Sequence, residues 1–105
     1  MTQAFDNHGN IVIVDDQPNN LRVLSGILQQ AGYKVRPALN GNFALQSIKS
    51  SPPDLILLDI RMPDMDGYEV CRRLKADELT REIPVIFISA LQDMEDKLSA
   101  FRVGG

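Results

Sequence analysis

The stretch Pro53–Gly67, PDLILLDIRMPDMDG, decides the fold, because it contains an unbroken apolar run that ends in a carboxylate. Leu55 to Leu58 show no alternation of polar and apolar residues, which predicts a parallel strand buried on both faces by helices. Asp59 follows at the carboxyl end of that strand, the edge at which open α/β sheets bind ligands. Turn-forming residues from Met62 onward bring the chain out and over this carboxylate. The alternative is an aspartate that simply ends a strand.

Strands and helices alternate along the rest of the chain. Short apolar or β-branched runs predict further strands at residues 11–14, 33–37 and 84–88. Helical spacing and turn residues predict helices from Pro18 to the residue before Gly32, from Gly41 to about residue 50, and at about 67–75 and 93–102. With right-handed crossovers, this order gives an α/β fold with a doubly wound parallel sheet and helices on both faces.

Length and composition indicate one domain of ordinary globular type. The chain has 105 residues, a formal net charge of −3 and 44% hydrophobic residues. This acidic balance gives no reason to expect direct binding of nucleic acid, which needs a basic face. The polar start MTQAFDNHGN predicts a flexible leader over residues 1–10, without the apolar segment of a signal peptide. No apolar run has membrane-spanning length, and the single cysteine, Cys71, suits a reducing compartment, so we expect a cytoplasmic protein.

Polar groups follow three of the predicted strands at the same edge of the sheet. Asp15 and Asp16 follow the first strand, Asp59 the third and Ser89 the fourth. Clustered carboxylates repel one another unless protons or a cation offset their charge, and oxygen ligands favour Mg²⁺. With a metal bound, Asp59 could act as a nucleophile toward phosphorus, with the Ser89 hydroxyl holding phosphoryl oxygens. Alternatively, Asp15 and Asp16 are helix-capping or solvated acids.

These residues resemble the receiver domain of two-component response regulators. The resemblance is carried by VDDQPNN at 14–20, LLDIRMPDMDG at 57–67 and PVIFISA at 84–90, and it extends over residues 11–105. It implies a flavodoxin-like sheet with strand order 2-1-3-4. It also implies that Asp59 is the phosphoacceptor, that Asp15 and Asp16 form an acidic pocket for Mg²⁺, and that the main-chain carbonyl of Arg61 is a metal ligand. Ser89 matches the switch hydroxyl that moves toward the phosphoryl group.

The resemblance further implies partners and a mode of action. A histidine kinase or phosphotransfer protein would donate the phosphoryl group, and an output domain or partner protein would respond to it. The chain would be a signalling domain rather than an enzyme, catalysing at most its own phosphorylation and dephosphorylation.

The sequence departs from the family pattern after the fourth predicted helix. The fifth strand with its lysine, and the fifth helix, have no match, so we expect a receiver domain truncated at this point. The fourth strand, VIFI at 85–88, would then be an exposed apolar edge, and one face of the sheet would keep only the first helix. From this we expect self-association through the fourth strand, or low stability.

Two other functions are alternatives to the phosphoacceptor. One is a receiver-like interaction or self-association module that is not phosphorylated. The other is an enzyme or cofactor carrier of flavodoxin type, which needs a phosphate-cradling loop after the first strand. The loop DDQPNN is acidic, the chain contains no GxGxxG or GxxxxGK[ST] motif, and Arg61 stands where a haloacid-dehalogenase-like phosphatase needs a second aspartate.

Overall fold

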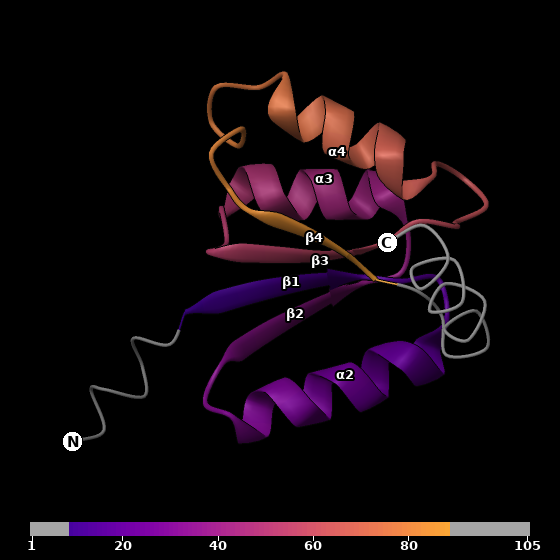
Figure 1. Ribbon diagram of the computed structural model, residues 1–105, viewed down its shortest axis with the longest axis vertical. Coiled ribbons are helices and arrows are strands. Elements are labelled where there is room, and N and C mark those ends of the chain that lie inside the picture. Colours follow the sequence, from indigo (N-terminus) through magenta and orange to yellow (C-terminus); the bar gives the residue numbers. More distant parts are fainter. Residues whose placement is uncertain (1–8, 89–105) are drawn as a thin grey trace, which may run out of the picture.

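The computed structural model describes residues 9–88, which form a parallel sheet between two layers of helices (Figure 1). The strands are β1 (Asn10–Val14), β2 (Lys34–Ala38), β3 (Leu55–Asp59) and β4 (Val85–Ile88). The helices are α2 (Pro18–Gln30), α3 (Gly41–Ser50) and α4 (Gly67–Lys75). Each predicted element in this range is present, and no end differs from the predicted one by more than one residue. The predicted helix at 93–102, Ser89 and residues 1–8 lie outside the described range.

The strand order is β2-β1-β3-β4, as predicted. All three pairings are parallel, and β1 lies between β2 and β3. In the register of β1 with β3, Val14 is opposite Leu58. The residues that follow these two therefore leave the sheet side by side at its carboxyl edge. This central pairing is the feature of the fold that assembles the site described below.

The larger part of the core lies between the sheet and helices α3 and α4. Inward side chains of β1 and β3 meet the apolar stripes of both helices there: Val12, Val14, Ile56, Leu58, Ala44, Ile48, Val70 and Leu74 are all essentially inaccessible. A smaller cluster on the opposite face joins Ile11 and Ile13 of β1 to Leu21 of α2. Figure 1 shows the same division, with α2 alone on one side of the strands and α3 and α4 on the other.

The burial predicted for β3 is wrong on one face. Ile56 and Leu58 are fully buried toward α3 and α4, whereas Leu55 and Leu57 are only partly buried toward α2. The physical reason is that α2 packs on β1 and β2 and leaves the β3–β4 half of that face less covered by the residues described. Ile86 of β4, which lies opposite Leu57, is 51% exposed.

Side-chain caps fix where α3 and α4 begin at the carboxyl edge of the sheet. The Asn40 side chain accepts a hydrogen bond of 2.8 Å from the amide of Phe43, and Asp66 accepts one of 2.9 Å from Glu69. These contacts satisfy amides that the first turn of a helix leaves without partners. At the other edge, Gly32 has a φ of 101° and ends α2 in the left-handed conformation.

Candidate functional site

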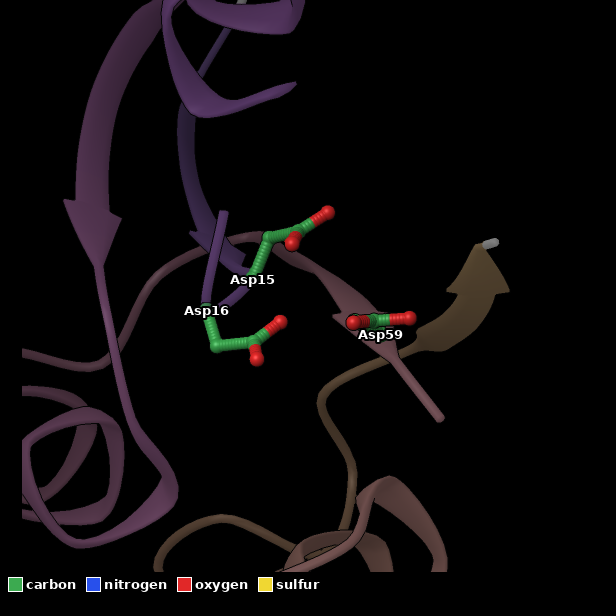
Figure 2. A group of neighbouring side chains, drawn as sticks. All are labelled: Asp15, Asp16 and Asp59. Carbon is green, nitrogen blue, oxygen red and sulfur yellow. The ribbon is translucent and has the colours of Figure 1, made fainter. Parts of the chain in front are cut away.

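Three aspartates meet at the carboxyl edge of the sheet. Asp15 and Asp16 directly follow β1, and Asp59 is the last residue of β3 (Figure 2). One carboxylate oxygen from each residue lies within 4.8 Å of the other two. Asp15 is fully buried, Asp59 is 3% exposed and Asp16 is half-buried. The structure thus brings together three of the residues that the sequence marked as a candidate site.

The backbone holds this arrangement. The amide of Asp15 donates a 3.0 Å hydrogen bond to the carbonyl of Ala38, which extends the pairing of β1 with β2 by one residue. On its other side, β1 pairs with β3 up to Val14 and Leu58. Asp15 and Asp59 therefore stand on neighbouring strands at the centre of the sheet, where their positions are fixed by the surrounding ladder.

Burial and mutual repulsion make ionisation of these carboxylates costly. Burial, followed by the negative charge of Asp15, raises the pKa of Asp59 to about 6, although hydrogen bonds from the Arg61 and Ile60 backbone oppose the rise. Burial also raises the pKa of Asp15, while hydrogen bonds from Gln17 and Asn20 favour its charged form. A nearby cation would relieve both effects, because it stabilises the ionised carboxylates.

Asp15 is neither a solvated acid nor the cap of α2. Its Oδ1 accepts a 2.9 Å hydrogen bond from the amide of Gln17, the residue that precedes α2, and its side chain is inaccessible to water. A capping side chain would instead accept from an amide within the first turn of the helix. The alternative interpretation of the Asp15–Asp16 pair therefore fails for Asp15.

Asn20 is a residue of the site that the sequence interpretation missed. Its Nδ2 donates a 3.3 Å hydrogen bond to Oδ2 of Asp15, and only 8% of the residue is exposed. A signal was present: Asn20 lies four residues before Leu24, on the side of α2 where an apolar residue would be expected. A polar residue at such a position indicates a buried hydrogen-bond partner.

The loop after β3 folds tightly against Asp59. The amide of Gly67 donates a 2.8 Å hydrogen bond to the carbonyl of Ile60. A Cβ atom at Gly67 would stand 2.3 Å from the carbonyl oxygen of Asp59, so only glycine fits this contact. The loop after β3 therefore turns back against the backbone of Asp59, and Gly67 sets how closely it approaches.

A cavity of about 460 Å³ opens on the Asp16 side of the cluster. It is lined by Asp16, Asp66 and Tyr68 together with the loop residues Ile60, Arg61, Met62 and Pro63. Arg61, whose main-chain carbonyl the family resemblance implies as a metal ligand, lines this cavity, and its backbone forms a hydrogen bond with Asp59. Ser89 lies outside the described residues, so the structure does not place it.

The donor set fits a small divalent cation. All three side chains offer hard oxygen ligands, the kind that Mg²⁺ prefers over nitrogen or sulfur. Oxygens that share one Mg²⁺ at about 2.1 Å lie roughly 3–4 Å apart. The three carboxylate oxygens would therefore need to move only slightly closer together to bind one ion. The adjoining cavity leaves room for the waters and phosphate oxygens that Mg²⁺ commonly retains.

Within residues 9–88, no helix combines the length and the apolar character needed to cross a membrane.

The chain is similar to known response regulators over most of its length. Residues 11–105 match the family described as response regulator receiver domain. The response regulator PleD of Caulobacter vibrioides is 44% identical over 94 residues, which are 90% of this chain but 21% of PleD. This chain spans roughly a fifth to two fifths of the curated relatives that it matches.

Solved structures agree with this assignment. The N-terminal domain of a response regulator receiver protein from Methanoculleus marisnigri has a TM-score of 0.76 at 31% identity, covering 89% of this chain and 93% of that one. The response regulator TrrA of Thermotoga maritima, solved in complex with Mg²⁺-BeF, has a TM-score of 0.73 at 34% identity, covering 88% and 78%. The fold, the site and these likenesses together show that the chain belongs to the response regulator receiver domain family.

Proposed function

We propose that this chain is the phosphoacceptor of a two-component phosphorelay and that Asp59 receives the phosphoryl group. The observation that carries the proposal is the position of Asp59. It is a nearly buried carboxylate at the end of a central strand, grouped with Asp15 and with Asp16, which lines a cavity of about 460 Å³. Catalysis of phosphoryl transfer is mostly positioning and charge neutralisation, and this arrangement offers both.

The donor is a phosphohistidine of a histidine kinase or phosphotransfer protein. An Asp59 carboxylate oxygen attacks phosphorus, a new P–O bond forms, and the P–N bond to the donor breaks. The bonding electron pair stays with the histidine nitrogen, which is then free to take up a proton. The backbone hydrogen bonds from Ile60 and Arg61 favour the ionised form of Asp59, the form that attacks.

Asp15, Asp16 and Asp59 would hold Mg²⁺, with the main-chain carbonyl of Arg61 as a further ligand. When bound, Mg²⁺ neutralises charge on the carboxylates and on the phosphoryl oxygens. The hard-oxygen donor set and the Mg²⁺ in the complex of TrrA both support this choice. We assign the switch role to Ser89 on the basis of the family motif alone.

The phosphorylated chain would act on an output domain or partner protein, as a signalling domain without substrate turnover of its own. We propose a cytoplasmic location and no direct contact with nucleic acid, in keeping with the net charge of −3. Modification of Asp59 would change the charge and the hydrogen bonding at the carboxyl edge of the sheet, which is how such a switch changes a partner surface.

Phosphorylation in vitro tests whether Asp59 is the acceptor. After incubation with Mg²⁺ and acetyl phosphate, we expect mass spectrometry to detect one phosphoryl adduct that is stable in acid and labile in base. Asp59→Asn should abolish the adduct, because an amide is not a nucleophile toward phosphorus at neutral pH. Asp64→Asn makes the same chemical change at an exposed position of the same loop and should leave the adduct intact. Absence of any adduct on the unchanged chain would refute the proposal.

A second candidate function is a self-association module, and a specific observation favours it. Among residues 9–88, β4 pairs only with β3, and two of its apolar residues are exposed, Ile86 at 51% and Phe87 at 38%. An apolar strand at a sheet edge is a template for pairing with another chain. This function needs no phosphorylation and could accompany the first.

A further inference from the structure

Asn20 is a buried amide with no role in the mechanism so far. It lies in the first turn of α2, is 8% exposed, and directs Nδ2 toward Oδ2 of Asp15 at 3.3 Å. The contact defines the orientation of the amide, because a carboxylate accepts from the NH₂ group and repels the carbonyl oxygen. Asn20 therefore faces the three-aspartate cluster from the helix side.

The two hydrogen bonds to Asp15 act on different oxygens. The amide of Gln17 donates to Oδ1 at 2.9 Å, and Asn20 donates to Oδ2 at 3.3 Å. Donors on both oxygens fix the plane of the carboxylate, which a single donor would leave free to turn. Each carboxylate oxygen has about two lone-pair sites, so both remain able to bind a cation. The Asp15 group is thus oriented before any ligand arrives.

The choice of an amide at this position also has a chemical reason. A carboxylate at residue 20 would add a fourth negative charge to a cluster in which three already repel one another. A lysine would supply a competing cation, and an apolar side chain would leave Oδ2 of Asp15 without this donor. Asn supplies a hydrogen bond while leaving the charge of the cluster unchanged.

From this geometry we propose that Asn20 is a positioning residue of the metal site, which orients the Asp15 carboxylate for a divalent cation. The inference rests on the proposed function, since it assumes that the three aspartates bind Mg²⁺. Partners that orient a metal ligand from outside the coordination sphere commonly change metal affinity by about 10–100-fold when removed.

The test is Mg²⁺ binding by isothermal titration calorimetry, with the metal alone as the probe. Asn20→Leu removes the donor and keeps similar volume, and Asn20→Ala repeats the loss with a smaller side chain in case leucine does not fit. We expect both to weaken Mg²⁺ binding about tenfold or more. Asn19→Leu and Asn19→Ala are the matched controls, because Asn19 is exposed on the same turn. They should bind Mg²⁺ within about twofold of the unchanged chain.

A second readout separates positioning from a general loss of structure. In acetyl phosphate reactions, Asn20→Leu should raise the Mg²⁺ concentration for half-maximal rate and largely keep the rate at saturating Mg²⁺. A merely structural role would lower the maximal rate without moving the half-saturation point. If both Asn20 variants bind Mg²⁺ within twofold of the unchanged chain, the inference about Asn20 is overturned and the proposed function is not affected. Failure of the unchanged chain to bind Mg²⁺ would instead overturn the proposed function.

Discussion

At the scale of single residues, the ionisation of Asp59 is the property on which the rest depends. Its pKa of about 6 is caused mainly by burial at the end of β3, and then by the neighbouring charges of Asp15 and Asp16. At neutral pH the Asp59 carboxylate is ionised, and keeping the charge at this buried position lowers the free energy of unfolding. The site therefore costs the chain stability in the absence of a cation, a common feature of functional clusters.

The raised pKa of Asp59 predicts how the stability of the chain depends on pH. The unfolded chain binds a proton at Asp59 with a pKa near 3.8 and the folded chain with a pKa of about 6. The folded state thus binds more protons between these values, and the contribution of Asp59 to stability falls as pH rises through this window. Above it, the cost is constant and corresponds to about 1–3 kcal/mol.

Urea unfolding in EDTA measures this cost. Asp59→Asn should stabilise the chain by about 1–3 kcal/mol at pH 7.5 and by much less at pH 4, where Asp59 is largely protonated in the folded state. Saturating Mg²⁺ should stabilise the unchanged chain more than the variant, since it binds the folded site. Equal unfolding free energies of the two chains at both pH values would contradict the raised pKa.

The sequence was sufficient to predict the aspartates but not their surroundings. Asp15, Asp16 and Asp59 follow apolar runs, and parallel strands deliver such residues to one edge whatever the details of packing. Asn20 could not be identified in the same way, because its partner Asp15 is five residues away and the hydrogen bond depends on how α2 leaves the sheet. Motifs predict which residues meet, whereas burial and hydrogen bonding require the packed structure.

At the scale of elements, the junction between β3 and α4 is the tightest contact at the site. Gly67 begins α4 directly against the backbone of Asp59, with Asp66 capping the same helix end. The predicted bounds of α4, residues 67–75, are those observed, because turn residues and a strong apolar stripe mark both ends. The two-sided burial of β3 was wrong, since an apolar run does not reveal how far a helix extends over it.

Two glycine substitutions compare this junction with an ordinary helix position. Gly67→Ala places Cβ 2.3 Å from a backbone oxygen and should lower stability by about 1–3 kcal/mol. It should also weaken Mg²⁺ binding, because the loop must shift away from Asp59. Gly26→Ala meets no atom within 4 Å on α2 and should raise stability by about 0.5–1 kcal/mol. Urea denaturation and Mg²⁺ titration of both variants measure these effects, and a neutral Gly67→Ala would show that the loop accommodates a side chain.

At the scale of the whole molecule, the two faces of the sheet differ in how completely they are covered. Helices α3 and α4 bury one face almost entirely, while α2 covers β1 and β2 on the other (Figure 1). Ile27 on α2 and Ile86 on β4 are both more than half exposed. Of the two, Ile86 lies on the strand at the edge of the described sheet, and an apolar edge strand favours association with another chain.

Self-association should therefore depend on β4. We expect sedimentation velocity to show a concentration-dependent dimer, and Ile86→Lys to shift the chain toward monomer by placing a charge on the edge strand. Leu79→Lys is the matched control, because Leu79 is 72% exposed in the segment between α4 and β4. A single monomeric species of the unchanged chain at all concentrations would exclude the module, whatever the state of Asp59.

The pairing of β1 with β3 also sets an order of events during folding. Asp15 and Asp59 are far apart in the sequence, with β2 and α3 between them, and they meet only when β1 pairs with β3. Contacts between distant segments form late, after the cost of closing the intervening chain has been met. A cation that needs both carboxylates has no complete site on the early folding chain. Its stabilisation would appear mainly as slower unfolding, which makes the folded chain longer-lived rather than quicker to fold.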